Sequence, residues 1–231
     1  MGHPARIKGI KGSGVKDQGR LRAVIVFDFD GVLGDTLDEM LRIAGQVAAE
    51  LGHPCQPTPA DLDALERMEF SELGKQLGIP ASQADEFARR SFELFAALTN
   101  PPQIFPGMKQ VVLDLAPTND LAIITGNTTR IVDRFLTENG LGACFTMVLG
   151  SDAPGSRAEK LNQILSRLEA PYGKAYLVGD SVSDVRVAGE TGLVSIAVTW
   201  GHQSEAHLSQ VRPRYLVHTP QELLNLLNGI I

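Results

Sequence analysis

Two carboxylates stand one residue apart at the end of an apolar run, where Asp28 and Asp30 follow the sequence VIVF at 24–27. Burying an unpaired carboxylate is costly, and a strand that continued through Asp30 would place both side chains on one face. Mg²⁺ relieves such repulsion because it prefers oxygen ligands. A calcium loop is the nearest alternative, but Val32 and Leu33 occupy positions where such a loop needs polar ligands. The run therefore predicts a magnesium site at the tip of a buried strand.

A second pair of acids follows a later apolar run. Asp180 and Asp184 come directly after AYLVG at 175–179, in the sequence GDSVSD. The alternative role for this turn is helix capping by Ser181 or Ser183, with Asp184 favoured by the helix dipole. Capping does not require the second acid, so we expect Asp180 and Asp184 to share the cation with the first pair.

A third strand-like run, at 121–124, ends in Thr125, Gly126 and Asn127. A hydroxyl, a glycine N–H and an amide directly before a helix can bind an anion such as phosphate. Capping by Asn127 or Thr128 is the alternative, and the motif by itself is weak evidence. Together with the two acid pairs, it predicts a phosphate site at one edge of a sheet.

The sequence PGSRAEK at 154–160 begins a helix and offers two candidate cations, Arg157 and Lys160. Leu161 and Ile164 mark the buried stripe of this helix, and the basic residues lie one turn before them, so either could reach the strand tips. A solvated surface charge is the commoner fate of a single lysine or arginine. The choice between Arg157 and Lys160 stays open on these grounds.

Two further residues lie at the end of the strand-like run 195–200 and just after it. Trp200 is most simply a packing residue. His202 follows it at the same edge of the sheet, where an exposed and titratable side chain could contact a substrate.

Short apolar runs alternate with helical patterns along the chain, which predicts parallel strands with helices on both faces. The strand-like runs are 23–29, 121–126, 146–150, 175–180, 195–200 and 215–218. The interval 37–103 instead shows helical patterns at 37–51, 60–77 with a break near 70–71, and 82–98. The predicted fold class is α/β: a doubly wound parallel sheet built from 23–36 and 104–231. An inserted α-helical cap, 37–103, would sit above the carboxyl ends of the strands.

The chain has 231 residues and a net charge of −6, but residues 1–22 hold six Lys and Arg against one acid. We expect 1–22 to be a basic flexible tail, with a docking or targeting role as the alternative. The acidic remainder argues against a nucleic-acid-binding body. No apolar run reaches the roughly 20 residues of a membrane span, and no signal peptide is evident. Cys55 and Cys144 lack metal-site spacing and predict reduced thiols in a cytoplasmic protein.

The order of these motifs resembles that of the haloacid dehalogenase superfamily of phosphohydrolases. DFDGV, IITGN, a basic residue and GDSVSD are similar to its four signatures, in that order along the chain from Ala23 onward. The helical insertion is similar to the family's helical cap of the first type. FPGM, VTWGH and RYLVHTPQELLNLL further resemble the phosphoglycolate phosphatase branch. The resemblance implies a Rossmann-like core and an enzyme that acts on phosphate esters.

The resemblance also implies roles for the acids. Asp28 would be the nucleophile that forms an aspartyl-phosphate, and Asp30 the general acid and then the general base. Mg²⁺ would be held by Asp28, the backbone carbonyl of Asp30 and Asp180, with Asp184 as a direct or indirect ligand.

The phosphoryl oxygens would be bound by Thr125, Gly126 and Asn127, with a basic side chain beside them. The basic position departs from the family, because PGSRAEKL replaces its usual Lys-Pro pair. The register of the leucine stripe favours Arg157, whereas the type of side chain favours Lys160.

We therefore expect a Mg²⁺-dependent phosphatase for a small phosphate monoester, with 2-phosphoglycolate as a candidate substrate. Asp30 disfavours dehalogenation, because a halide leaves without a proton. A sugar phosphomutase of the β-phosphoglucomutase type is the main alternative, and a catalytically inactive phosphate-binding regulatory module is the other. The cap segment RMEFS at 67–71 does not match the arginine of many relatives, which leaves the substrate open. The expected partner is a small phosphorylated metabolite, with no nucleic acid or membrane, and the chain would be a monomer or homodimer.

Overall fold

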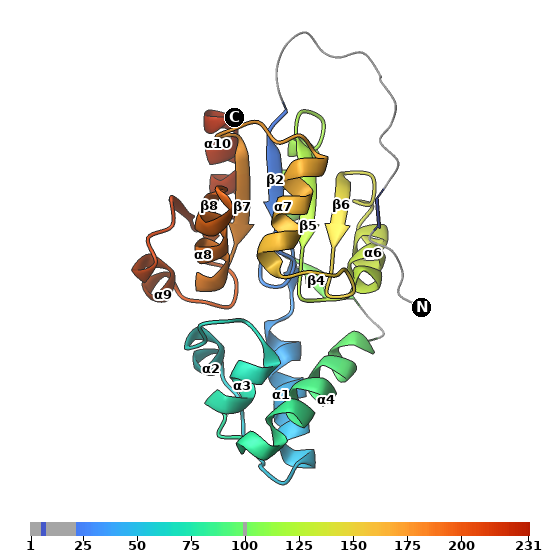
Figure 1. The fold of residues 1–231 in the computed structure, drawn as a ribbon, viewed down its shortest axis with the longest axis vertical. Helices are drawn as coiled ribbons and strands as arrows, with labels where there is room; N and C mark the ends of the chain where they lie inside the picture. The colour runs from blue at the N-terminus through green and yellow to red at the C-terminus, as the bar shows by residue number, and fades with distance from the viewer. Residues whose placement is uncertain (1–5, 8–21, 99–100) are drawn as a thin grey trace.

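The computed structural model describes residues 6–7, 22–98 and 101–231, and it consists of an α/β body with a smaller helical unit at one end (Figure 1). The strands are β1 Arg6–Ile7, β2 Val24–Phe27, β3 Gly34–Asp35, β4 Gln103–Ile104, β5 Asp120–Ile124, β6 Phe145–Leu149, β7 Ala175–Gly179, β8 Val194–Val198 and β9 Tyr215–Val217. The α-helices are α1 Leu37–Glu50, α2 Pro59–Asp63, α3 Phe70–Gln76, α4 Ala84–Ala96, α5 Met108–Leu115, α6 Thr129–Glu138, α7 Arg157–Arg167, α8 Val182–Thr191, α9 Glu205–Gln210 and α10 Pro220–Ile230, and a 3₁₀ turn spans Ala81–Gln83.

The main sheet has the strand order β1-β6-β5-β2-β7-β8-β9, in which every pair except β1–β6 is parallel. The prediction of a doubly wound parallel sheet is confirmed. The chain builds outward from β2 to β6 on one side and from β7 to β9 on the other. The direction of winding therefore reverses between β2 and β7, and open α/β sheets bind ligands at the carboxyl ends of strands at such a point.

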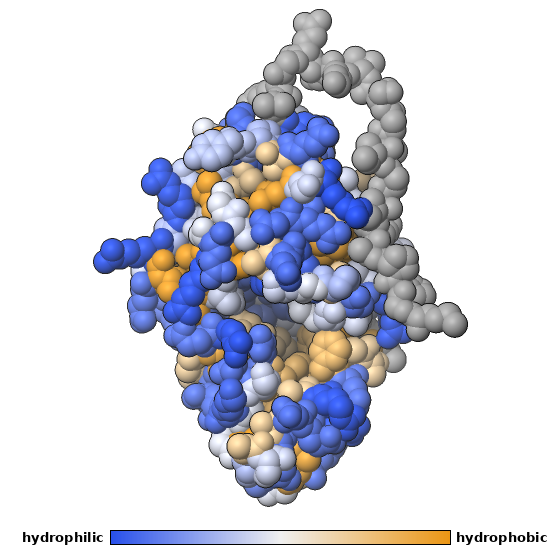
Figure 2. Space-filling model, viewed as in Figure 1, coloured by the Kyte–Doolittle hydropathy of each residue, from blue (hydrophilic) through white to orange (hydrophobic). Residues whose placement is uncertain are grey.

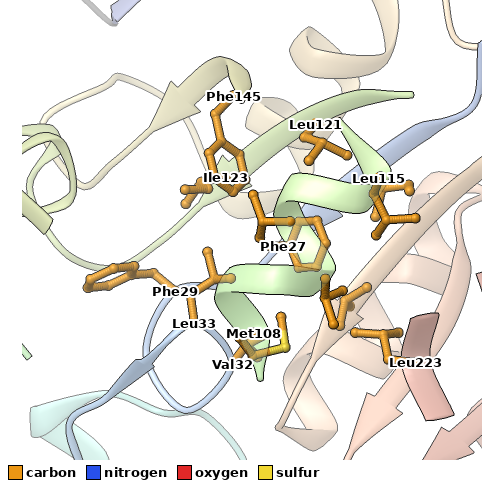
Figure 3. Close-up of a cluster of buried hydrophobic side chains, with 14 of the residues drawn as sticks. Phe27, Phe29, Val32, Leu33, Met108, Leu115, Leu121, Ile123, Phe145 and Leu223 are labelled. Carbon is orange, nitrogen blue, oxygen red and sulfur yellow. The ribbon is translucent and has the colours of Figure 1, made fainter. Parts of the chain in front are cut away.

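Each face of the sheet has its own core, because successive side chains of a strand point to opposite faces. Ile25 and Phe27 belong to the larger cluster, which packs against α5, α6 and α10. Figure 3 shows this cluster, with Phe27, Ile123 and Leu121 gathered beside Met108 and Leu115 of α5. Val24 and Val26 pack on the other face, under α7 and α8. Burial on both faces explains why the strand sequences are continuously apolar.

The helical unit, which we call the cap, has a separate core formed by α1, α2, α3 and α4. Gly74 of α3 lies against Phe87 of α4, where an added Cβ would be 2.7 Å from the ring. Residues 64–69 are not helical, so the expected break in the second helical pattern is longer and begins earlier than predicted. This non-helical segment faces the body of the molecule and contributes to the site described below.

Two antiparallel strands join the cap to the body. β3 pairs with β4, with Gly34 opposite Ile104 and Asp35 opposite Gln103, so the chain enters and leaves the cap at the same place. A Cβ on Gly34 would lie 2.9 Å from the Pro102 ring, which explains the glycine at this crossing.

Part of the predicted tail lies in the sheet. Arg6–Ile7 pairs with β6, whose outer edge would otherwise present unpaired N–H and C=O groups. Arg22 donates to the carbonyls of Ala116 and Pro117, at 3.1 and 2.9 Å, and so contacts the body. The rest of the expected tail, 1–5 and 8–21, lies outside the described residues. Among the described helices, none has the length and apolar character needed to cross a membrane.

Candidate active site

The segment after β2 turns sharply instead of continuing as a strand. β2 ends at Phe27, and the following residues close a tight turn onto the carbonyl of Phe29. Gly31 has a φ of +75°, and a Cβ there would lie 1.9 Å from Asp180 Oδ2, so this position requires glycine. The strand therefore does not extend through Asp30, as a shared face for both side chains would require, and Asp30 contacts Asn127 instead.

Three carboxylates from two loops meet at the edge where β2 and β7 end. Asp28 follows β2, Asp180 follows β7, and Asp184 lies in the first turn of α8. One oxygen from each lies within 4.8 Å of the others, so the structure brings these three predicted ligands together. The Asp30 side chain is not a member of this cluster, and the expected contact of its backbone carbonyl with the metal stays a prediction.

Asp28 carries negative charge that its neighbours do not fully compensate. Its Oδ1 accepts a hydrogen bond from the Phe29 N–H at 2.8 Å and lies 3.3 Å from Arg157 Nη2. Burial raises the pKa of Asp28 well above its ordinary range. Arg157 opposes this rise, but Asp184 and Asp180 add to it. A cation at the cluster would relieve the repulsion.

Asp184 is fixed by the residue that caps its helix. Ser181 accepts a hydrogen bond from the Asp184 N–H, and its own hydroxyl donates to Asp184 Oδ2 at 2.6 Å. Capping of α8 and placement of the acid are thus provided by one serine. The capping alternative and the ligand prediction are therefore compatible.

Asp180 is paired with His202, which differs from the exposed histidine that the sequence suggested. The His202 side chain is almost fully buried, with its backbone N–H 2.7 Å and its Nδ1 3.0 Å from Asp180 Oδ2. Its Nε2 lies 3.2 Å from Thr36 Oγ1. Burial alone would lower the pKa of His202, but Asp180 outweighs it and raises the pKa to about 9. His202 therefore supports an acid of the cluster, and only its position at the end of the fifth strand pointed to the site.

Asp30 is held by the residues of the predicted anion site. Asn127 Nδ2 donates to both of its carboxylate oxygens, at 2.9 and 2.7 Å, and Thr125 Oγ1 lies 3.4 Å from Oδ2. Burial raises the pKa of Asp30, although His202, Asn127 and Thr36 oppose the rise. This rise is in the direction that a proton donor requires.

Arg157, rather than Lys160, contacts the acids. Arg157 Nη2 lies 2.5 Å from Asp184 Oδ1 and 3.3 Å from Asp28 Oδ1. Burial would lower the pKa of Arg157, but these two carboxylates raise it above its ordinary value, so the guanidinium stays charged. Lys160 Nζ donates to the Gly150 carbonyl at 2.8 Å, and burial lowers the pKa of this lysine. Both side chains line the cavity between body and cap.

That cavity has a volume of about 760 Å³ and opens where the cap meets the body. Figure 2 shows the hollow between the two parts, with apolar surface on its cap side. The floor is formed by the acids and by Thr125, Gly126 and Asn127, and the cap contributes the non-helical segment and parts of α3 and α4. Gly126 has open space beside its Cα, so its backbone is accessible from the cavity.

The residues present fit a hard divalent cation. Asp28, Asp180 and Asp184 offer oxygen atoms and excess negative charge, which Mg²⁺ prefers. Within the described part of the chain, Arg157 Nε and Asn127 Oδ1 are buried side-chain atoms without a hydrogen-bond partner at the same site. Buried polar groups are normally satisfied, so their presence is consistent with a polar ligand beside the acids.

Comparisons with known proteins agree with the fold and the motifs. The family model of haloacid dehalogenase-like hydrolases matches residues 25–198. A phosphoglycolate phosphatase of Synechococcus elongatus is 27% identical over 208 residues, which cover 90% of this chain and 98% of that protein.

Solved structures show the same fold. A haloacid dehalogenase-like family hydrolase from Streptococcus pneumoniae superposes with a TM-score of 0.78 at 24% identity, over 89% of this chain and 98% of that one. A protein assigned as a β-phosphoglucomutase from Thermotoga maritima gives a TM-score of 0.63 at 24% identity, over 90% of this chain and 100% of that one.

Proposed function

The chain belongs to the haloacid dehalogenase-like hydrolase family and is a phosphatase, and from this premise we propose that it hydrolyses a small phosphate monoester through an aspartyl-phosphate on Asp28, with Mg²⁺ as cofactor. The observation that supports this proposal best is the cluster of Asp28, Asp180 and Asp184 beside Arg157. A phosphate dianion needs positive charge to approach such a cluster. Mg²⁺ bound by the three acids would supply that charge, and Arg157 would add to it.

Asp28 is the proposed nucleophile because it follows β2 directly and lines the cavity. The described contacts of its carboxylate involve Oδ1, which leaves Oδ2 available to attack phosphorus. The new Oδ2–P bond forms as the bond between phosphorus and the leaving oxygen breaks. A phosphoryl group thereby moves from substrate to Asp28.

Asp30 is the proposed proton carrier. In the first step its carboxyl proton goes to the leaving oxygen, so the product departs as an alcohol. In the second step the carboxylate takes a proton from water, whose oxygen attacks phosphorus and releases inorganic phosphate and free Asp28. Asn127 holds Asp30 through both oxygens, so we assign Asn127 a positioning role in addition to phosphate binding. The open backbone of Gly126, with Thr125, is the remaining proposed contact for phosphoryl oxygens.

The substrate proposal is 2-phosphoglycolate, on the ground that several relatives are named phosphoglycolate phosphatase. The cavity volume of about 760 Å³ also accommodates larger phosphorylated metabolites. Arg67, a cap cation that lines the cavity, is paired with Glu72 at 2.9 Å, in an exposed pair that a substrate carboxylate could replace at little cost.

The test is release of inorganic phosphate by the purified protein from a panel that contains 2-phosphoglycolate and sugar phosphates. Activity should require Mg²⁺ and be lost with a chelator. Asp28→Asn should abolish turnover, and unchanged turnover in that variant would refute the proposed mechanism.

A sugar phosphomutase is the second candidate, favoured by the structural likeness to a protein assigned as a β-phosphoglucomutase. A mutase would return the phosphoryl group to a different hydroxyl of the sugar rather than transfer it to water. Following ³²P between positions of a hexose phosphate separates the two, since a phosphatase yields only free phosphate.

A cytoplasmic location and a monomeric or homodimeric state complete the proposal. The absence of a membrane-spanning helix among the described residues is compatible with that location. Cell fractionation and size-exclusion chromatography with light scattering test the two statements.

A further inference from the structure

Gln203 is a buried polar residue between the body and the cap. It follows β8 in the loop that also carries His202, and only 1% of its surface is exposed. It does not line the cavity, so it has no direct contact with a substrate in the site proposed above. Its side chain nevertheless connects two segments that do contribute to that site.

The two ends of the Gln203 amide contact different parts of the molecule. Its Oε1 accepts a hydrogen bond from the Val182 N–H at 2.7 Å. Its Nε2 donates to the carbonyls of Asp63 and Leu65, at 3.1 and 2.7 Å. Val182 is the first residue of α8 and lies between Asp180 and Asp184 in the sequence, whereas Asp63 and Leu65 belong to the cap.

The neighbours of Gln203 reinforce this connection. On one side, His202 is bonded to Asp180. On the other side, the backbone N–H and hydroxyl of Ser204 donate to the two carboxylate oxygens of Asp63, at 2.7 and 2.9 Å. Residues 202–204 thus join Asp180 to the end of α2. This contact between body and cap is separate from the β3–β4 junction.

We propose that Gln203 is a positioning residue that couples docking of the cap to the placement of the loop bearing Asp180 and Asp184. The inference rests on the proposed function for its effect on turnover, but the coupling itself is a property of the fold. When the cap is docked, the Gln203 amide donates to the carbonyls of Asp63 and Leu65 and accepts from the Val182 N–H. When the cap moves away, the amide loses both acceptors and is freer to release Val182.

The chemistry of glutamine suits this role. A primary amide provides one acceptor oxygen and two N–H donors, which match one N–H and two carbonyls. Glutamate keeps the acceptor but presents an oxygen to the two carbonyls, and methionine keeps the length but offers neither strong group. Methionine leaves the buried backbone groups at both ends of the bridge unsatisfied, whereas glutamate leaves only the two cap carbonyls without a donor.

Three variants separate the two ends. Gln203→Met removes the contacts at both ends, and Gln203→Glu removes the contacts to the cap. Ser204→Ala removes one contact to the cap and the N-cap hydrogen bond of α9, without touching the segment that carries Asp180 and Asp184. Amide hydrogen exchange, followed by NMR, reports the state of Val182 and of residues 64–69 independently of activity. It is measured with and without Mg²⁺ and inorganic phosphate as the probe.

In the wild type we expect Mg²⁺ with phosphate to slow exchange of residues 64–69 and of Val182 together. Gln203→Met should speed Val182 exchange by at least about fivefold, as loss of one hydrogen bond implies, and should abolish the joint response. Gln203→Glu should speed exchange of 64–69 while Val182 stays protected. Ser204→Ala should keep the joint response.

The same variants give a kinetic readout. Gln203→Met should raise the Mg²⁺ concentration for half-maximal phosphate release by at least about fivefold, whereas Ser204→Ala should leave it within twofold of wild type. A role in general stability alone would lower the melting temperature without moving the Mg²⁺ requirement.

Wild-type exchange that does not respond to the probe, or a Gln203→Met variant with wild-type exchange at Val182, would overturn the inference. If the wild type releases no phosphate from any ester but shows the joint exchange response, the proposed function fails and the coupling stands.

Discussion

The two acidic loops differ in how firmly the protein holds their carboxylates. After β7, the side chains of Asp180 and Asp184 are 1% and 3% exposed, and each has protein donors on its oxygens. After β2, the Asp28 side chain is 14% exposed and accepts one backbone hydrogen bond on a single oxygen. The acids after β7 are held in place by their neighbours, whereas Asp28 after β2 presents its carboxylate to the cavity.

This difference matches the proposed division between metal binding and chemistry. A metal ligand is best immobilised by its neighbours, as Ser181 and His202 immobilise the β7 acids. A nucleophile must keep an oxygen free. In Asp28, the proposed nucleophile, partial burial and the neighbouring acids raise the pKa of the carboxylate. The predictions below test whether the two loops divide the work in this way.

The largest effect is expected for Asp28→Asn, which should lower kcat by about 10⁴-fold or more because no nucleophile remains. Phosphate release under saturating Mg²⁺ measures it. The stability of the metal-free protein should move the other way, upward, because a carboxylate that burial and the neighbouring acids disfavour is removed. A lower melting temperature in chelator would mean that Asp28 is chiefly structural.

Asp30→Asn should lower kcat by about 10²–10⁴-fold for an alkyl phosphate, because the leaving alkoxide then receives no proton. The loss should be much smaller for p-nitrophenyl phosphate, whose leaving group is stable as an anion. Equal losses for the two substrates would contradict the role of proton donor.

Asp184→Asn should act on metal binding rather than on the chemical step. The Mg²⁺ concentration for half-maximal activity should rise by about 10–100-fold, while kcat at saturating Mg²⁺ falls less than in the Asp28 variant. Titration of activity against Mg²⁺ checks both parts. Asp28→Asn, the matched variant in the loop after β2, is assayed for Mg²⁺ binding by calorimetry for comparison.

The smallest effect concerns Asp152, a carboxylate at the same edge of the sheet but outside the acid cluster. Burial would raise its pKa, but hydrogen bonds from the Thr129 side chain and N–H outweigh it and lower the pKa. Its contribution to stability is therefore present above the ordinary aspartate pKa of about 3.9 and lost as pH falls through the lower folded value.

Asp152→Asn should reduce the free energy of unfolding near neutral pH by less than about 1 kcal/mol, since the site is exposed to solvent. It should also flatten the loss of stability in acid. Urea unfolding between about pH 3 and 7 measures the free energy of unfolding of the variant. Asp28→Asn in chelator is the comparison, since its stability is expected to rise. Greater stability of the Asp152 variant in neutral solution would show that Thr129 does not hold the carboxylate.

The sequence predicts the fold well because its signals are local. Continuous apolar runs identified β2, β5, β6, β7, β8 and β9, and parallel strands bring the residues after them to one edge. The convergence of Asp28 with Asp180 and Asp184 follows from that topology alone. The register of Leu161 in α7 likewise favoured Arg157, which contacts the acids.

The sequence could not predict contacts that depend on loop conformation or on distant segments. The turn at Gly31 places the Asp30 carboxylate beside Asn127. This turn needs a glycine because Asp180 leaves no room for a Cβ at position 31. His202 pairs with Asp180, and Gln203 contacts the cap. These partners are far apart in the sequence, and no local sequence pattern connects them. The pairing of β1 with β6 depends on an open sheet edge that two residues cannot signal.

The paired strands β3 and β4 give the inserted helices a single attachment point. Because the entropic cost of closing an insertion grows only slowly with its length, helices could be added or removed beyond this junction with little penalty to the sheet. Selection could thus exchange the helices that line one side of the cavity as an independent module, while the acids on its other side stay in place.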